Sequence, residues 1–167
     1  MEFAMKQVCS LVGLSVLLSA CCLAQSARDA LAFLTPLRDA SQVQNADQYA
    51  DHYAALFASD GRWDGPIGQN AIGPLNIKAA VDQFFTEFGP LREVQAGARQ
   101  LSPDIVLADV YQMIEGSRHA SLDRKLIARG SGTPPPADFR TTLVLRKEGS
   151  GWNIIAARVA DLRAERR

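Results

Sequence analysis

Two aspartates, Asp64 and Asp109, have surroundings in the sequence that could support proton transfer. Asp64 stands in WDGPIG, between a tryptophan and a glycine-rich turn, and Asp109 stands in the alternating stretch DIVLADVYQM. A carboxylate in an apolar pocket has a raised pKa and can act as a general base. The alternatives are a turn or pocket-rim role for Asp64 and a structural ion pair of Asp109 with Arg140 or Arg158.

The pairing of two expected strands places Asp109 in a pocket. If Ser102 and Pro103 form a two-residue turn, the antiparallel pairs are Leu101 with Asp104, Ala98 with Leu107, Ala96 with Asp109 and Val94 with Tyr111. Two small alanines on the shared face leave space, which indicates an apolar cavity that holds a carboxylate. The residues expected on this face are Val94, Ala96, Ala98, Leu107, Asp109, Tyr111 and Met113.

Aromatic residues complete the expected pocket wall. Tyr49 and Tyr53 lie on the apolar stripe of a helix expected over residues 45–59, and Trp63 follows that helix. His52 lies at the edge of the stripe, either as a pocket residue or as a boundary residue. The two histidines of the chain show no spacing typical of metal ligands, so we expect neither a metal site nor a cofactor.

The first 24 residues have the pattern of an export signal. The apolar run over residues 8–20 is too short to span a bilayer, and Met5 is an alternative start. LSAC, which ends at Cys21, resembles the bacterial lipobox, whose cysteine is lipidated; the alternative is ordinary cleavage after Ala24. We therefore expect an exported protein, either soluble in the periplasm or secreted, or anchored to the cell envelope through a lipid on Cys21.

Residues 25–167 are expected to form one domain. The chain has 167 residues, of which 47% are hydrophobic and 22% charged, as in an ordinary globular protein. Its formal net charge is zero, so the charge gives no indication of a nucleic-acid partner. All three cysteines lie at or before residue 22, so the domain has no disulfide and no thiol nucleophile.

The hydrophobic period changes from helical to alternating along the domain. Helical spacing predicts helices over residues 27–43, 45–59 and 74–88, the last opened by Gly73 and Pro74 and closed by Gly89 and Pro90. Alternation then predicts strands over residues 92–101, 104–116, 139–148 and 152–160. The segment between the second and third strands fits either a short helix or an irregular strand. Helices followed by an antiparallel sheet predict an α+β fold in which the helices cover one face.

Several of these segments together resemble one superfamily. The helix end LFASDGRW, the GPIG turn, the helix GPLNIKAAVDQFFTEFGP and the hairpin TLVLRKEGSGWNI are similar to the nuclear transport factor two superfamily. The branch they resemble is SnoaL-like and ketosteroid isomerase-like, and it includes exported proteins of the SgcJ/EcaC type. The resemblance implies a cystatin-like fold, with a cone-shaped, curved, mainly antiparallel sheet against three N-terminal helices. It also implies a pocket inside the cone and a homodimer.

The same resemblance argues against steroid isomerase chemistry. The proton-transferring acid of those isomerases falls on Gly65, and Asp64 lies one residue away. The tyrosine expected on the first helix is missing, and the acid that binds the oxyanion falls near a threonine. In limonene epoxide hydrolase, which belongs to the same superfamily, an Arg-x-Asp strand motif activates water; here Leu107 replaces the arginine and Asp109 alone matches.

Three functions remain open from the sequence. The first is binding of a small hydrophobic molecule in the cone, oriented by Asp109 and Tyr111. The second is a small isomerase, cyclase or hydrolase that uses Asp109 or Asp64 as a general base. The third is a dimerising structural protein that binds no ligand and uses its sheet as the interface.

Overall fold

Along the chain, the helices come before the longest strands. The computed structural model describes residues 25–35, 37, 46–89, 91–114 and 137–162. A helix over residues 25–33 comes first. The elements that follow are α3 (Ala46–Ala54), β1 (Phe57–Asp64), β2 (Asn70–Ile72), α4 (Pro74–Phe88), β3 (Leu91–Ser102), β4 (Ile105–Ile114), β5 (Phe139–Glu148) and β6 (Gly151–Asp161). The expected export signal, Cys21 and residues 115–136 lie outside the described residues.

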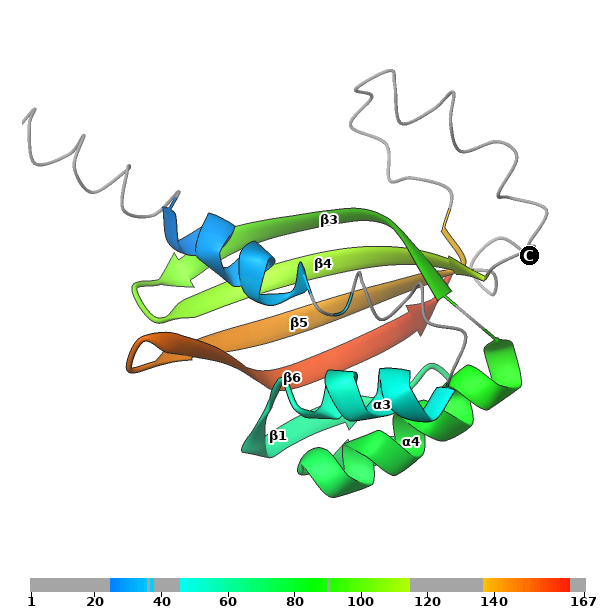
Figure 1. The fold of residues 1–167 in the computed structure, drawn as a ribbon. Helices are drawn as coiled ribbons and strands as arrows, with labels where there is room; N and C mark the ends of the chain where they lie inside the picture. Colours follow the sequence, from blue (N-terminus) through cyan, green and yellow to red (C-terminus); the bar gives the residue numbers. More distant parts are fainter. Residues whose placement is uncertain (1–24, 36, 38–45, 90, 115–136, 163–167) are drawn as a thin grey trace, which may run out of the picture.

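Six strands form one curved sheet in the order β2-β1-β6-β5-β4-β3. Every neighbouring pair is antiparallel except β1 with β6, which is parallel. The helix over residues 25–33 lies over β3 and β4, whereas α3 and α4 lie near β1 (Figure 1). The predicted α+β fold, with three helices against a mainly antiparallel sheet, is confirmed. In the described part of the chain, no helix has the length and hydropathy needed to cross a membrane.

The helix α4 has the boundaries that the sequence predicts. Gly73 precedes it with a φ of 77°, and Pro74 occupies the first turn, where its missing N–H is not needed. At the other end the Gly89 N–H donates to the Phe85 carbonyl oxygen at 2.8 Å, with a φ of 81° that suits glycine. The buried face of α4 consists of Ile77, Val81, Phe84 and Phe85.

The stretch after α3 is a strand, which corrects the expected helix over residues 45–59. α3 ends at Ala54, and the backbone N–H of Ile154 on β6 donates to the Leu56 carbonyl oxygen at 2.8 Å. Tyr53 and Phe57 have helical spacing, and their rings lie 5.3 Å apart between centroids. That spacing fits a helix in the sequence, but pairing with β6 sets an extended backbone from Phe57 onward. Pattern alone could not reveal this partner, because β6 lies about a hundred residues later in the chain.

Because side chains alternate along β1, two neighbouring residues of the WDGPIG motif face opposite sides of the sheet. Trp63 points toward the helices and is 1% exposed. Asp64 points to the other face of the sheet, where it lies between Asn70 on β2 and Arg158 on β6. The tryptophan is therefore part of the core, and the aspartate is not.

Aromatic side chains fill much of the space between the helices and the sheet. Tyr49 stacks on Phe85 with ring centroids 5.3 Å apart, and Trp63 meets Phe84 edge-on at 6.1 Å. Complete burial of side chains of this size stabilises a fold by roughly 2–3 kcal/mol each. The aromatic residues joined by these ring contacts are Tyr49, Tyr53, Phe57, Trp63, Phe84, Phe85, Phe88 and Phe139.

Candidate functional site

The turn between β3 and β4 lies one residue later than the sequence indicates. Its two residues are Pro103 and Asp104, and the Ser102 hydroxyl donates to the Asp104 carboxylate at 2.7 Å. The register then shifts between Gln100 and Ser102, so that Leu101 forms a bulge. The later turn moves the pairing of the two strands in one direction, and the bulge moves it back by a smaller amount. Most of the hairpin therefore stands one residue away from the expected pairing.

A slip of one residue places the side chains of β4 on the opposite face. Asp109 pairs with Gly97 and not with Ala96. Ala96 and Ala98 pack against the core below the helices. The residues of β4 on the face turned away from the helices are Leu107, Asp109 and Tyr111. Ala98, Leu107, Asp109 and Tyr111 do line one depression, as expected, but it lies on the face turned away from the helices, and Ala96 does not line it.

Both candidate catalytic aspartates lie outside the cone. The Thr142 hydroxyl donates to Asp109 at 2.7 Å, and no ion pair joins Asp109 to either arginine proposed as its partner within the described residues. Asp64 is paired with Arg62, whose Nε lies 2.9 Å from the carboxylate oxygen. Neither aspartate is placed to act as a base on a ligand held between the helices and the sheet.

A second bulge in β3 brings a different carboxylate to the inner face. The register shifts between Glu93 and Gln95, so that Val94 has no partner residue on β4. Glu93 consequently pairs with Gln112, whose side chain faces the helices. With regular alternation from Gln95, Glu93 would face the opposite side. Sequence reasoning missed Glu93 because a bulge is invisible in a hydrophobic pattern.

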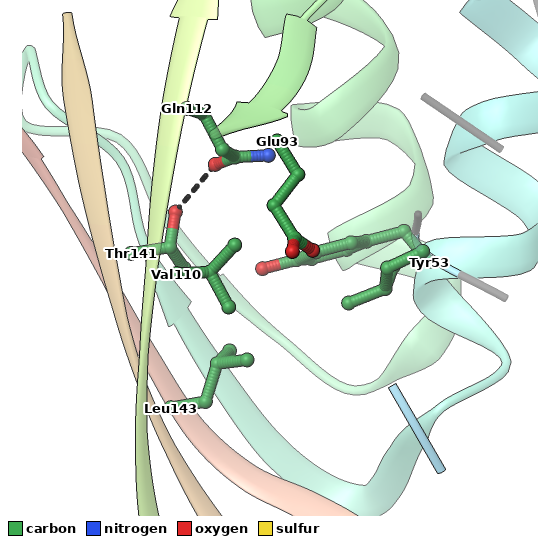
Figure 2. Close-up of a pocket in the computed structure, with 7 residues that line it drawn as sticks. Tyr53, Glu93, Val110, Gln112, Thr141 and Leu143 are labelled. Atoms are coloured by element: carbon green, nitrogen blue, oxygen red, sulfur yellow. Dashed lines mark hydrogen bonds between the residues drawn. The ribbon is translucent and has the colours of Figure 1, made fainter. Parts of the chain in front are cut away.

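The inner face carries a group of polar side chains, the inner polar cluster: Tyr49, Tyr53, Glu93, Gln112 and Thr141. The Thr141 hydroxyl on β5 donates to the Gln112 side-chain oxygen on β4 at 2.9 Å. The side chain of Gln112 also hydrogen-bonds Tyr49 on α3, and that of Trp63 hydrogen-bonds Tyr53. Figure 2 shows Glu93 and Tyr53 extending into the same space from β3 and from α3. The cluster thus links the helices to the middle of the sheet.

Both tyrosines of the inner polar cluster stay protonated at neutral pH. Burial raises the pKa of Tyr49 to about 12; the hydrogen bond from Gln112 opposes this, and the negative charge of Glu93 adds to it. Burial also raises the pKa of Tyr53, and neighbouring Tyr49 adds to that rise. Neutral phenols of this kind are hydrogen-bonding groups and not bases. The cluster is therefore suited to orienting a ligand.

Two small spaces lie beside the inner polar cluster, each of about 10 Å³. A space of this size admits one water-sized group. The first is the inner hollow, lined by Leu37, Tyr53, Glu93, Val110, Gln112, Thr141 and Leu143. The second is lined by Tyr49, Tyr53, Trp63, Val81, Phe84, Leu91, Gln112, Thr141 and Val159. Side chains of the described residues fill the rest of the cone more fully than the sequence led us to expect.

Other residues expected in the pocket are placed differently. His52 is exposed on the outer side of α3, so it does not reach the cone. Met113 is buried, and its sulfur is 3.9 Å from the Arg92 guanidinium; it is not among the residues that line the two inner spaces. Among the described residues, no group of three or more histidines, cysteines or carboxylates could hold a metal ion.

The face turned away from the helices has a larger depression, the outer hollow, of about 270 Å³. Gly97 helps to form it, because a Cβ at that position would meet no atom within 4 Å. The remaining lining residues are Gln95, Ala98, Arg99, Leu107, Asp109 and Tyr111. Arg140 and Arg158 are exposed on the same face, and the described residues include no ion-pair partner for them. This face is open and carries charges of both signs.

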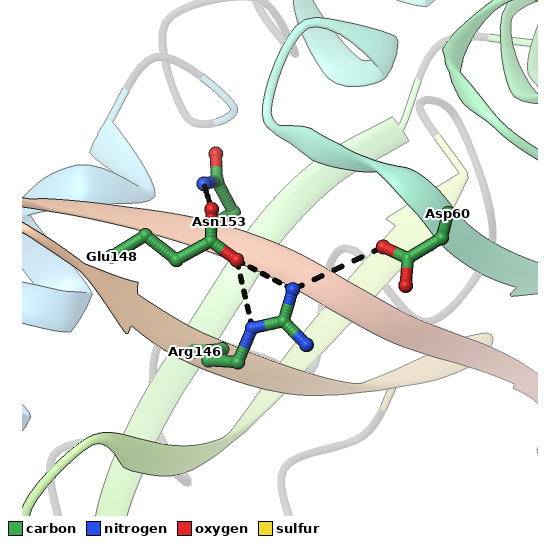
Figure 3. A network of polar contacts seen from close by, with 4 residues as sticks. All are labelled: Asp60, Arg146, Glu148 and Asn153. Carbon is green, nitrogen blue, oxygen red and sulfur yellow. Dashed lines mark hydrogen bonds and ion pairs between the residues drawn. The ribbon is translucent and has the colours of Figure 1, made fainter.

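Arg146, at one end of the same face, is paired. Its Nε donates to Glu148 at 2.8 Å, and Asn153 on β6 donates to the other oxygen of Glu148 at 3.0 Å (Figure 3). Asp60 on β1 lies 3.9 Å from the same guanidinium. The network joins the β5–β6 hairpin to β1, and it gives Asp60 a structural role.

Gly65 stands where the resemblance places a proton-transferring acid, and the position is closed to any side chain. A Cβ on Gly65 would lie 2.4 Å from the Gln69 side-chain oxygen and 2.6 Å from the ring of Trp63. The Gly65 N–H also donates to the Gln69 carbonyl oxygen at 2.9 Å. The loop therefore closes over the tryptophan, and it has no room for the acid that steroid isomerisation requires.

Solved structures share this fold at low sequence identity. An NTF2-like protein of unknown function from Pseudomonas putida KT2440 is 14% identical, with a TM-score of 0.57 over 84% of this chain and 92% of that one. A domain of unknown function with a cystatin-like fold from Nostoc punctiforme PCC 73102 is 18% identical, with a TM-score of 0.55 over 84% and 82%. A SnoaL-like family protein from Agrobacterium tumefaciens C58, described as an isomerase candidate, is 13% identical, with a TM-score of 0.51 over 78% and 95%.

These likenesses establish the fold and leave the activity open. No family profile and no curated protein sequence matches the chain. The predicted cystatin-like, NTF2-like fold and the predicted likeness to SnoaL-like proteins are confirmed. The narrower likeness to SgcJ/EcaC-type proteins stays a prediction. Function has to be argued from the site, because one fold carries many functions.

Proposed function

We propose that the protein binds a small, largely apolar molecule inside its cone and orients the polar head of that molecule with the inner polar cluster. The observation that carries this proposal is the hydrogen-bonded pair of Thr141 and Gln112, which faces the inner hollow among apolar residues. Sites for small molecules combine apolar walls with a few such polar groups. The NTF2-like fold is compatible with a ligand in this place.

The size of the inner hollow limits how a ligand enters. A space of about 10 Å³ holds a hydroxyl or an amine but not a ring. The body of the ligand therefore has to displace side chains of the wall, and Leu37 and Tyr53 line the hollow from the helical side. Binding should consequently favour compact molecules with one polar head.

Two neighbouring threonines provide the test, because Thr141 faces the hollow and Thr142 faces the opposite side of the sheet. Benzyl alcohol serves as a neutral probe. We expect Thr141→Val to weaken its binding about fivefold, the value of one neutral hydrogen bond, and Thr142→Val to leave the affinity unchanged. Titration calorimetry measures both. Equal affinities of the two variants for benzyl alcohol would show that the inner polar cluster does not bind the probe.

The bases expected for the isomerase, cyclase or hydrolase alternative do not face the inner polar cluster. Asp109 and Asp64 both lie on the face turned away from the helices. The inner polar cluster holds one carboxylate, Glu93, beside two neutral tyrosines. An enzyme acting inside this cone would therefore depend on Glu93.

We also propose that two copies of the chain pair through the open face of the sheet. The apolar and aromatic side chains partly exposed there are those of Leu107, Tyr111 and Val144. The charged residues beside them are Asp109, Arg99, Arg140 and Arg158, which could meet opposite charges of a second copy. A Val144→Asp variant would then be monomeric at micromolar concentrations at which the parent chain is dimeric, as measured by analytical ultracentrifugation. A monomeric parent chain would contradict this pairing.

The proposal for cellular location rests on the sequence alone. We propose that the chain is exported and that its pattern around Cys21 directs lipidation and anchoring to the cell envelope. Labelling of the expressed protein with a radioactive fatty acid should mark the parent chain and not Cys21→Ser. Unlabelled protein of mature length would instead indicate ordinary cleavage.

A further inference from the structure

The outer hollow is close in size to a small-molecule site. Its volume is about 270 Å³, and pockets that bind small molecules begin at roughly 300 Å³. Gly97 contributes no side chain to it, and no atom lies within 4 Å of the position that a Cβ would take there. The strand therefore leaves space for a compact molecule on this face of the sheet.

Arg99 and Asp109 bring opposite charges to the outer hollow, which both of them line. Arg99 on β3 pairs with Leu107 on β4, and Asp109 pairs with Gly97. The two charged residues are therefore diagonal neighbours on one face of the sheet. Diagonal neighbours lie about 7–8 Å apart or slightly less, with the side chains directed to the same side.

Neither of these charges is neutralised within the described residues. No ion pair joins Arg99 or Asp109 to each other or to another described side chain. The Thr142 hydroxyl donates to one oxygen of Asp109 at 2.7 Å, which orients the carboxylate and leaves its other oxygen as an acceptor. The Arg99 side chain is exposed, and a guanidinium offers five N–H donors. Charged donors and a charged acceptor thus border the same space.

The outer hollow also has an apolar part. Leu107 and Tyr111 line it, and both side chains are partly exposed on β4, one on each side of Asp109. A molecule held by the two charges would therefore place an apolar body against one of these side chains. The combination of two opposite charges and an apolar wall matches a zwitterion with a hydrophobic side chain.

We propose that the outer hollow binds an α-amino acid with an apolar side chain. The Arg99 guanidinium donates to its carboxylate, and its ammonium group donates to the Asp109 carboxylate. Two charge-assisted hydrogen bonds of about 2.8 Å each, together with the short distance between the charges of an α-amino acid, span a gap of this size. This inference goes beyond the proposed site inside the cone and does not depend on it.

Three probes with one apolar body separate the contributions of the two charges. L-Leucine carries both charges, 4-methylpentanoate lacks the ammonium group, and 3-methylbutylamine lacks the carboxylate. Each is titrated into ¹⁵N-labelled chain at pH 7 and low salt, and the Gly97 amide signal is followed. We expect leucine to bind about fivefold more tightly than either single-charge probe, which is the upper value for one exposed ion pair. Sodium chloride at about 0.5 M should reduce this preference, because salt screens exposed charges.

Two variants assign the charges of leucine to their partners. Arg99→Gln should abolish the preference for leucine over 3-methylbutylamine, and Asp109→Asn should abolish the preference over 4-methylpentanoate. Arg140→Gln is the matched control, because Arg140 is exposed on the same face but does not line the hollow, so this variant should keep both preferences. Circular dichroism shows whether each variant is folded.

The same charges are available for the proposed pairing of two copies, so analytical ultracentrifugation of each variant is the second readout. If Arg99→Gln and Asp109→Asn lose the dimer and bind leucine as the parent does, the charges serve the pairing and the inference is wrong. It is also wrong if leucine binds no better than the single-charge probes. The site inside the cone is tested separately with benzyl alcohol, so these outcomes leave that proposal unchanged.

Discussion

An aspartate in place of Gly65 is expected to destabilise the fold by at least about 3 kcal/mol and to create no isomerase activity. The new Cβ would lie 2.6 Å from the buried Trp63 ring, which cannot move without disturbing the core. Urea unfolding followed by tryptophan fluorescence measures the loss of stability.

Gly97 provides the control, since it lies in a strand with open space where a Cβ would stand. Gly97→Ala should change the free energy of unfolding by about 0.5 kcal/mol or less, whereas Gly65→Ala should already cost about 2 kcal/mol. A Gly65→Asp protein as stable as the parent would mean that the loop has room for an acid. The shape of this loop would then no longer exclude steroid isomerase chemistry.

Replacement of Trp63 by alanine is expected to lower the free energy of unfolding by about 4 kcal/mol. Its side chain is 1% exposed, meets Phe84 edge-on and hydrogen-bonds Tyr53. The change removes the largest side chain of the cone, so it leaves a cavity as well as a lost contact. Chemical denaturation monitored by circular dichroism measures the effect.

Trp63→Phe separates packing from hydrogen bonding. It keeps an aromatic ring against Phe84 but removes the indole N–H that Tyr53 uses, so we expect an intermediate loss of about 2 kcal/mol. Trp63→Ala should also bind benzyl alcohol more tightly, provided it is folded, because the cone then has room for the ring. A loss below about 1 kcal/mol for Trp63→Ala would show that Trp63 is not central to the core.

Elements with strong local signals could be predicted from the sequence. α4 has a glycine at each boundary and a regular apolar face, and both features are local in the chain. The hairpin of β5 and β6 is equally clear, because Glu148 pairs with Gly151 around Gly149, whose φ of 61° suits glycine. Nothing distant in the chain competes with these signals.

The register of β3 against β4 could not be predicted in the same way. Alternation shows that two strands exist, but their pairing depends on the turn at Pro103 and Asp104 and on bulges at Leu101 and Val94. Each bulge exchanges the faces of every residue beyond it. For that reason the carboxylate that faces the helices is that of Glu93 and not that of Asp109.

The helix predicted through residue 59 failed for a different reason. Tyr53 and Phe57 do share one side of the core, as the helical spacing indicates. Their contact is achieved with a helix that ends at Ala54 and a strand that begins at Phe57. The aromatic pocket wall of Tyr49, Tyr53 and Trp63 could therefore be placed from the sequence, although the element that carries Trp63 could not.

The position of a bound probe tests the central claim most directly, because adjacent residues of β4 and β5 face opposite sides of the sheet. The measurement is a titration of ¹⁵N-labelled protein with benzyl alcohol, followed by the assigned side-chain and amide signals of Gln112, Thr141, Tyr111 and Thr142. For a ligand inside the cone, we expect the side-chain amide of Gln112 and the signals of Thr141 to shift most, with little change at Tyr111 and Thr142. Shifts concentrated on Tyr111 and Thr142 would place the ligand in the outer hollow and contradict a binding site inside the cone.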